Sequence, residues 1–508
     1  MHRRPGRPDA ERPRLPVTAD PGRKPKAPTS RPLGTPPTRR WAELGLLVPA
    51  LAIGISGYVL TNLNRTGTLP RHWWLVPVLG TLLALATHLV VRWRTPYADP
   101  IILPVVVALC GLGLAMLNRL DMAIGGGGVA RIQLVWMAVG VAIFLAIVIF
   151  LRDYRVLQRY PYLLFIVGMV LLLLPLLPVI GTNINGSRIW IRIAGYSFQP
   201  AEIAKIVLTL AFASYLADRS EVLASAGKKL GALTLPRLRD VVPVFIMWAA
   251  GVVVLVFQND LGTALLFFGL FVVMLYVATD RVSWVIGGLV AFAGAAFVIY
   301  RFAGHVQVRV DSWLHPFTDM NQNYQIIQGQ FGMAWGGLFG RGWGLGSPSL
   351  IPLAGTDFIS AALGEEIGLV GLTGIIVLYA LIVARGLKTA LLVRDSFGKL
   401  LTAGFSFVFV LQVTAIIGGV TRLLPLTGLT TPFLSRGGSS LVANWAIAAL
   451  LMVVSHQARR PVVEFEPFVD LDFEQTTVID LSSLEDGAVG PRVSTDDTTQ
   501  RLTKVGEP

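Results

Sequence analysis

The 508-residue chain is poor in cysteine and in charge. It has one cysteine and six histidines, and only 14% of its residues are Asp, Glu, Lys or Arg. The single cysteine, Cys110, excludes an internal disulfide framework, and the histidines show none of the spacings of zinc ligands. With 54% hydrophobic residues and a mean hydropathy of +0.64, the chain is too apolar for an ordinary soluble domain. It is predicted to be an all-α polytopic membrane protein.

The charge that is present gathers at the two ends. Residues 1–40 hold eleven Lys or Arg, three Asp or Glu and ten prolines, whereas residues 461–508 hold three Lys or Arg and eleven Asp or Glu. Both segments lack helical periodicity and are predicted to be disordered tails. The basic tail suits anionic membrane lipids. Without interleaved aromatic residues, it does not indicate nucleic-acid binding.

Long apolar runs are the dominant pattern between the tails, and about 20 apolar residues are enough to cross a bilayer as a helix. Twelve spans are predicted, near residues 42–63, 72–91, 99–118, 132–151, 160–181, 200–217, 240–257, 262–279, 283–302, 358–384, 400–420 and 439–457. An even number places both termini on one side. The connections on that side hold all the loop lysines (Lys228, Lys229, Lys388 and Lys399), so the positive-inside rule places both tails in the cytoplasm.

Three sizeable segments then face outside, namely the loops 182–199, 303–357 and 421–438. The longest is rich in glycine. A loop of that length in a membrane protein is usually functional or partly re-entrant.

Three carboxylates lie in or beside the tenth apolar run, where an ionised acid costs about 2.5–3.5 kcal/mol and is a functional candidate. Asp357, at the outer end, fits either a helix N-cap or a general base facing outside. At roughly 100° per residue, Glu365 lies about 80° round the helix from Asp357, and structural and functional roles stay equally open for it. Glu366 points to the opposite face and is predicted to make helix–helix hydrogen bonds.

The segment before the sixth span carries another polar group. Pro200 is predicted to lie in the first turn of that helix, and Glu202 and Lys205, at positions i and i+3, can pair. Arg188, Trp190 and Arg192 form an amphipathic patch suited to an anionic lipid headgroup. An ordinary aromatic and arginine anchor at the membrane interface, with a structural ion pair, is the alternative.

Two further outer turns contain polar residues. Asp260, between two spans, is predicted to be a helix N-cap. Ser435, Arg436, Ser439 and Ser440 lead into the last span and fit either a phosphate held at the helix N-terminus or capping with close helix packing. No nucleotide-binding loop and no Ser-His-Asp order appears.

Taken in order, these motifs resemble the SEDS family, the RodA, FtsW and SpoVE proteins of bacterial cell-wall synthesis, from about Asp99 to Arg460. The matching motifs are Gly186-Ser-Arg188-x-Trp190-Ile191, Phe198-Gln-Pro-Ala-Glu202-x-x-Lys205, Gln258-x-Asp-Leu-Gly-Thr263, Tyr324-Gln-x-x-Gln328, Thr356-Asp-Phe-Ile359, Gly364-Glu-Glu-x-Gly-x-x-Gly371, Gly428-Leu-Thr-x-Pro432 and Ser435-x-Gly-Gly-Ser-Ser440. The longer N-terminal layout looks most like that of actinobacterial RodA. The chain departs from the family pattern at Asn259, His315 and Arg436, where many members have Pro, Asp and Tyr.

The resemblance implies a ten-helix core over residues 99–460, with the large outer loop 303–357, preceded by two extra transmembrane helices in 41–98. It implies a peptidoglycan glycosyltransferase that polymerises lipid II by inverting transfer at the outer face of the cytoplasmic membrane, for cell elongation and shape. A division-specific polymerase like FtsW and a lipid II flippase are the alternatives. The implied partners are lipid II, membrane lipids and a class B penicillin-binding protein.

The resemblance also assigns residues. The catalytic base would be Asp357, and the substrate cavity would include Arg188, Trp190, Glu202, Lys205 and Glu365, together with the hydroxyls of Ser439 and Ser440. The pyrophosphate leaving group needs positive charge, from Arg188, Lys205 or a bound Mg²⁺ or Mn²⁺. No protein-built metal site is expected.

Overall fold

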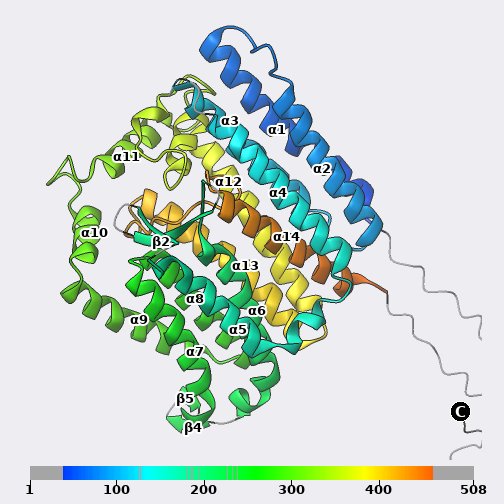
Figure 1. The fold of residues 1–508 in the computed structure, drawn as a ribbon, viewed down its shortest axis with the longest axis vertical. Helices are drawn as coiled ribbons and strands as arrows, with labels where there is room; N and C mark the ends of the chain where they lie inside the picture. Colours follow the sequence, from blue (N-terminus) through cyan, green and yellow to red (C-terminus); the bar gives the residue numbers. More distant parts are fainter. Residues whose placement is uncertain are drawn as a thin grey trace, which may run out of the picture. The chain divides into compact units, whose positions relative to one another are not determined.

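The structure is a computed structural model that describes residues 38–461, except 124, 126–127, 179, 185–186, 194, 226, 231–232 and 237. Figure 1 shows the arrangement of its elements. The predicted disordered tails fall outside the described residues, apart from their innermost positions.

The helices follow the predicted spans. They are α1 (Arg40–Thr66), α2 (Leu75–Arg94), α3 (Ile102–Ala123), α4 (Val129–Phe150), α5 (Pro161–Leu173), α6 (Pro200–Ser225), α7 (Leu238–Phe257), α8 (Leu261–Thr279), α9 (Val282–Phe302), α10 (Gly304–Leu314), α11 (Tyr324–Gly336), α12 (Ile359–Leu392), α13 (Ser396–Val420) and α14 (Gly438–Arg459), with short 3-10 helices η1 (Tyr154–Arg159), η2 (Leu174–Leu176) and η3 (Pro348–Leu350). Within the described residues, ten helices are long and apolar enough to cross a membrane. The protein is a multi-pass membrane protein.

Each of the twelve predicted spans coincides with a helix, but one of these helices, α5, is shorter than a full span. The α5 helix gives way to a 3-10 turn at Leu174, where Pro175 removes a backbone donor. Hydropathy alone does not show where an apolar run stops being helical.

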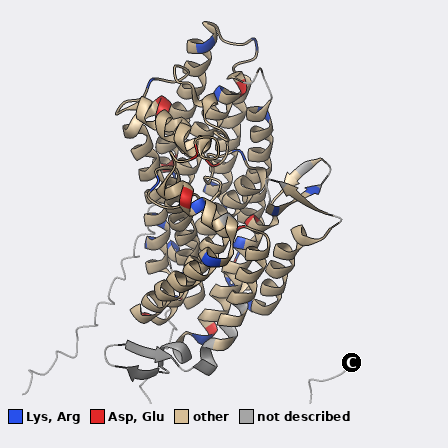
Figure 2. Cartoon of the chain, turned by 90° about the vertical axis from the view of Figure 1, so that its left-hand side faces the viewer, with Lys and Arg blue, Asp and Glu red and all other residues tan. Residues whose placement is uncertain are grey.

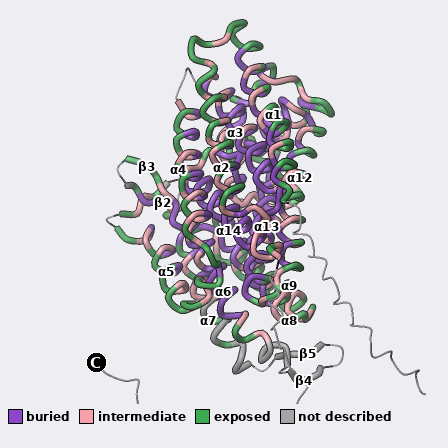
Figure 3. The backbone as a smooth tube through the Cα atoms, turned by 90° about the vertical axis from the view of Figure 1, so that its right-hand side faces the viewer, coloured by how far each residue is buried: buried purple, intermediate pink, exposed green. Residues whose placement is uncertain are grey.

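The bundle has two flanks and a centre (Figure 1). On one flank α1 packs on α3, and α2 on α4; on the other α5, α6, α7 and α8 pack on one another. Between the flanks, α12 packs on α3, α13 packs on α6 and α8, and α14 contacts both flanks. Buried residues concentrate in this centre (Figure 3). Lys, Arg, Asp and Glu are sparse along the helices (Figure 2), as the apolar surroundings of a membrane require.

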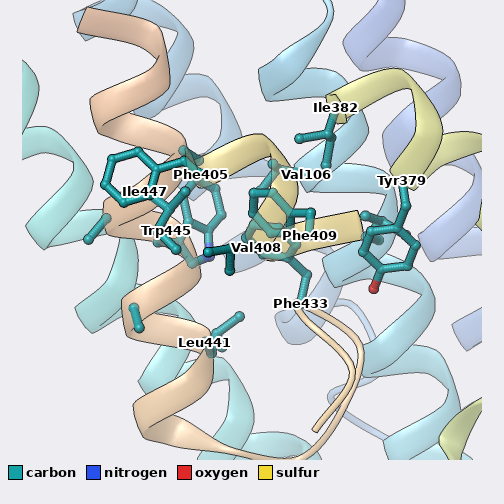
Figure 4. Close-up of a cluster of buried hydrophobic side chains, with 14 of the residues drawn as sticks. Val106, Tyr379, Ile382, Phe405, Val408, Phe409, Phe433, Leu441, Trp445 and Ile447 are labelled. Atoms are coloured by element: carbon teal, nitrogen blue, oxygen red, sulfur yellow. The ribbon is translucent and has the colours of Figure 1, made fainter. Parts of the chain in front are cut away.

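Aromatic side chains fill the centre of the bundle (Figure 4). Phe409 from α13 and Trp445 from α14 lie 5.9 and 6.4 Å, between ring centres, from Phe433. Phe433 belongs to the loop between these two helices and is 2% exposed. Because a buried aromatic ring contributes a large apolar area, this loop is anchored in the core.

Buried charges join the two extra helices to the core at one end of the bundle. Glu43 pairs with Arg40 and, at 2.7 Å, with His88. Arg40 also donates to the Ala98 carbonyl. The neighbouring Asp99 accepts from Arg385 at 2.8 Å and from Arg459 at 2.9 Å. Buried charges are stable only when paired in this way. The start of α1 and the end of α14 therefore lie at the same end, here named the terminal end; the opposite end is the distal end.

The predicted outer loop 182–199 is not irregular. It forms an antiparallel sheet in the order β1 (Gly181–Ile184), β2 (Ser187–Ile193) and β3 (Tyr196–Phe198), while β4 (Gly227–Leu230) and β5 (Leu233–Pro236) make a hairpin elsewhere. The period-2 alternation of β2, polar at Arg188 and apolar at Ile189 and Ile191, is typical of a strand. That alternation is the signal the sequence interpretation overlooked.

The distal segment between α9 and α12 holds α10, α11 and η3, and α12 itself is interrupted where it meets that segment. Gly368 has φ 69° and ψ −174° inside α12. A Cβ there would lie 2.2 Å from the Gly340 nitrogen, so only glycine fits. The following amides, of Leu369 and Val370, donate to carbonyls of the distal segment instead of to their own helix. The interruption fixes this segment to α12.

Candidate active site

Asp357 lies at the distal start of α12, but it does not cap that helix. The N-cap position is Phe358, and no side chain caps the helix there, so the capping interpretation of Asp357 was wrong. One carboxylate oxygen, Oδ2, lies 3.8 Å from the point where a Cβ on Gly428 would stand. The acid is therefore directed at the loop between α13 and α14 and remains available for another role.

Two hydrogen bonds join the two segments that meet at Asp357. The Ser435 hydroxyl donates to the Thr356 carbonyl at 2.6 Å, and the Arg436 amide donates to the Gly355 carbonyl at 2.7 Å. Ser435 thus positions the residue next to Asp357. Both bonds would hold the carboxylate in one place during a reaction, which is what catalysis by a general base requires.

Burial raises the pKa of Asp357 to about 6, although the Thr356 hydroxyl and the positive charge of Arg309 lower it. Such a pKa suits a general base, because the group is ionised near neutral pH yet still basic enough to accept a proton. Arg309 lies on α10 and was not singled out from the sequence. A lone arginine in a predicted outer loop carries no sequence signal of its partner.

A buried polar network also reaches the α13–α14 loop. Lys205 donates to Glu202 at 2.7 Å, which confirms the predicted i, i+3 pair, and to Gln412 at 3.1 Å. Gln412 donates to the Thr430 carbonyl at 2.8 Å, and the Thr430 and Ser440 hydroxyls are 3.0 Å apart. The network joins α6, α13 and α14 to the loop that Asp357 faces.

Ser439 and Asp260 were also singled out from the sequence, and both make hydrogen bonds to backbone amides. The Ser439 hydroxyl accepts from the Gln199 amide at 2.9 Å. Asp260 caps α8 through its Oδ1, which accepts from the Thr263 amide at 3.0 Å, and the predicted N-cap is confirmed. Burial raises the pKa of Asp260, while hydrogen bonding with Thr263 and, to a smaller extent, the charge of Arg309 lower it. Its Oδ2 is buried and has no hydrogen-bond partner among the described residues.

Arg188 and Trp190 lie apart from these groups, on β2. The Arg188 side chain is exposed and that of Trp190 half-buried. The Arg188 amide donates to the Gln258 carbonyl at 3.3 Å, which holds the sheet against the end of α7. Their assignment to the substrate cavity stays a prediction.

Glu365 and Glu366 bind the distal segment two turns further into α12. Glu366 accepts from Arg119 on α3 at 2.9 Å and from the Gly344 amide at 2.8 Å, which confirms the predicted helix–helix hydrogen bond. Glu365 accepts from the Ser347 amide at 2.7 Å. Both carboxylates hold backbone in place, and any contact of Glu365 with substrate stays a prediction.

An apolar cavity of about 870 Å³ lies beside the site. Residues from α7, α8, α9, α10, α13 and the segment 424–429 line it. Among its described lining residues, Arg309 is the one charged side chain. Thr427 and Leu429, which flank Gly428, also line it, so the cavity adjoins the loop that Asp357 faces.

The geometry can be compared with known proteins. The sequence profile of the FtsW, RodA and SpoVE family of cell cycle proteins matches residues 101–460. Peptidoglycan glycosyltransferase RodA of Mycobacterium tuberculosis is 48% identical over 434 residues, which are 84% of this chain and 92% of that protein. Stage V sporulation protein E of Bacillus subtilis is 33% identical over 335 residues, 65% of this chain and 87% of that protein.

Two solved structures of proteins from bacterial cell-wall synthesis have a similar fold. The rod shape determining protein RodA of Thermus thermophilus matches with a TM-score of 0.52 and 27% identity, over 72% of this chain and 98% of that one. A chain from a peptidoglycan synthase complex, studied for its coordination of polymerization and crosslinking, matches with a TM-score of 0.59 and 28% identity, over 71% and 98%. The chain belongs to the FtsW, RodA and SpoVE family.

Proposed function

We propose that this protein, a peptidoglycan glycosyltransferase like the relatives it matches over most of its length, polymerises lipid II with Asp357 as its general base. The observation that carries the assignment is the Asp357 carboxylate itself. It is held by its neighbours, takes no part in capping α12, faces the loop that lines an apolar cavity, and has its pKa raised to about 6 by burial.

In the proposed reaction Asp357 takes the proton from the 4-hydroxyl of an acceptor sugar. The resulting oxygen attacks the anomeric carbon of the donor, and the bond from that carbon to the pyrophosphate breaks. The electron pair leaves with the pyrophosphate, and the configuration inverts. One carboxylate suffices, because a pyrophosphate leaving group needs charge stabilisation rather than a proton.

The distal end is proposed to face the outside of the cytoplasmic membrane. The support is the lysine distribution, since Lys228, Lys229, Lys388 and Lys399 all belong to connections of the terminal end. Asp357, at the other end of α12, would then meet lipid II after the lipid has been flipped outward. Labelling an introduced distal cysteine with a membrane-impermeant reagent in whole cells tests this orientation; protection of that cysteine would reverse it.

Asp357→Asn in purified protein, assayed for glycan strands from lipid II, tests the general base. The matched control is Asp311→Asn, because Asp311 is an exposed acid on α10 at the same end. We expect strands from the control and at least a hundredfold loss in Asp357→Asn, the size of a general-base contribution. Full activity of Asp357→Asn would remove the assignment. Scrambling of lipid II in liposomes without polymer would favour the flippase.

A class B penicillin-binding protein is the proposed partner, and cell elongation the proposed process. The support is the likeness to RodA proteins and to a chain from a complex that couples polymerization with crosslinking. Co-purification from membranes with a transpeptidase that binds a labelled β-lactam is the expected result. Recovery of the chain without any such partner would count against the complex.

A divalent cation at the pyrophosphate is also proposed. The described residues include no group of three or more His, Cys, Asp or Glu that is placed to hold a metal ion. Mg²⁺, however, is commonly held by one or two carboxylates together with substrate phosphates. The buried Oδ2 of Asp260, which has no hydrogen-bond partner among the described residues, would be one such carboxylate oxygen, and the cation would add charge stabilisation to the departing pyrophosphate.

A further inference from the structure

The cavity beside Asp357 combines a long apolar lining with one cation. Of its described lining residues, those from α7, α8, α9 and α13 are almost all aliphatic or aromatic. Arg309 enters from α10, at the side where Leu426 and Thr427 also line the wall. An apolar pocket with a single convergent charged group is typical of a site for an amphiphilic ligand with a charged head.

The Arg309 guanidinium has more hydrogen-bond donors than the described residues use. Its hydrogen bonds with described residues come from Nη1 alone, to the carbonyls of Leu426 and Thr427, and both are long at 3.4 Å. A guanidinium has five N–H donors in a planar fork, which matches two phosphate oxygens at once. Most of that capacity is unused by the described fold.

The two cations named from the sequence are less suited to an anion in this cavity. Lys205 is 2% exposed and already bound to Glu202 and Gln412. Arg188 is exposed on β2, outside the cavity lining. Arg309 also acts electrostatically on the carboxylates of Asp357 and Asp260, so its charge lies within reach of the proposed reaction.

We propose that Arg309 binds the pyrophosphate of the polyprenyl-linked donor, with the first isoprene units in the apolar cavity. The inference rests on the proposed function and deepens it, because it identifies the group that receives the leaving charge. When the bond from the anomeric carbon to oxygen breaks, the pyrophosphate gains one negative charge while Asp357 holds the acceptor proton. A fixed cation at that point stabilises the transition state more than the ground state.

Binding of undecaprenyl pyrophosphate to the full-length protein in detergent tests this directly, without any turnover. The comparison ligands are undecaprenyl monophosphate, which has the same chain and one phosphate, and phosphatidylglycerol, an ordinary anionic lipid. We expect the wild type to prefer the pyrophosphate, and phosphatidylglycerol not to displace it. Loss of a charged hydrogen-bonding pair should weaken pyrophosphate binding by Arg309→Gln about tenfold or more.

Two further variants keep the test decisive. Arg341→Gln is the matched control, because Arg341 is an exposed distal arginine stacked on Trp335, 5.2 Å from its ring centre; it should bind like the wild type. Arg309→Lys keeps the charge without the fork and should lose most of the preference for pyrophosphate over monophosphate. If Arg309→Gln does not fold, as judged by thermal unfolding, the result for Arg309→Lys decides.

The outcomes separate this inference from the general base. If the Arg309 variants bind the pyrophosphate with the affinity and selectivity of the wild type, the inference is overturned. This holds whatever the polymerisation activity of Asp357→Asn. Weakened binding in those variants supports it even if Asp357→Asn still polymerises lipid II, a result that would remove only the proposed base. Displacement of the pyrophosphate by phosphatidylglycerol would mean a general lipid site and would also overturn it.

Discussion

The rate of polymerisation should rise with pH through about 6. Burial raises the pKa of Asp357 from 3.8 to about 6, and only the ionised carboxylate can accept the acceptor's proton. With that pKa, about one tenth of the protein holds ionised Asp357 at pH 5 and about nine tenths at pH 7. Initial rates from lipid II should therefore fall about tenfold between pH 7 and pH 5, whereas a base with an ordinary aspartate pKa would show almost no change.

The pH at which the rate rises, here called the acid limb of the pH–rate profile, should depend on Arg309. Because the arginine's charge lowers the pKa of Asp357, Arg309→Gln should move the limb to higher pH, and Arg341→Gln should leave it in place. A rate that stays constant between pH 5 and pH 7 would refute the argument from burial. A limb that is unchanged in Arg309→Gln would refute the coupling between the two groups.

Further variants test the contacts around the site. Glu366→Ala leaves the buried Arg119 unpaired, which should cost about 3–5 kcal/mol and lower the unfolding temperature in detergent. Asp260→Ala removes the cap of α8 and should cost about 1 kcal/mol in the same assay. Asn64→Ala removes a 2.7 Å hydrogen bond from α1 to the Trp343 carbonyl and should speed hydrogen exchange in residues 340–347. Chelation with EDTA should slow polymerisation, and added Mg²⁺ should restore it.

Each of these has a control or a contrary result. Replacing Glu366 and Arg119 together by Leu and Met should recover most of the lost stability; an unchanged unfolding temperature in Glu366→Ala would contradict the pairing. Asp260→Asn keeps a capping oxygen and should unfold close to the wild type. Equal exchange in Asn64→Ala would show that α1 does not restrain the segment. Full activity in EDTA would exclude an exchangeable cation.

Local patterns in the sequence predicted much of the fold and part of the site. The spans follow from apolar run length, because a bilayer demands about 20 apolar residues from any helix that crosses it. The Glu202–Lys205 pair and the Asp260 cap follow from spacings of three residues, which a helix brings together by its own geometry. In each case the partners are neighbours in the chain, so no knowledge of packing was needed.

Other features needed the packed bundle. The partner of Glu366 is Arg119, 247 residues away, and the sequence indicated only which face of the helix the acid occupies. Period-2 alternation in β2 was present but too short to stand out beside long apolar runs. The failure of Asp357 to cap α12 could not be read from its position next to Phe358, since an acid before a helix favours a cap in most contexts.

The sequence by itself determined that this is a multi-pass membrane protein of the FtsW, RodA and SpoVE family. It also identified Asp357 as the candidate general base. Both follow because hydropathy and ordered motifs are local properties of the chain. Only the tertiary structure decided what surrounds that acid. It brought Gly428 and Ser435 of the α13–α14 loop and Arg309 of α10 near it, and set Arg309 in the wall of an apolar cavity. These contacts depend on how helices pack, and the residues that meet there are far apart in the sequence.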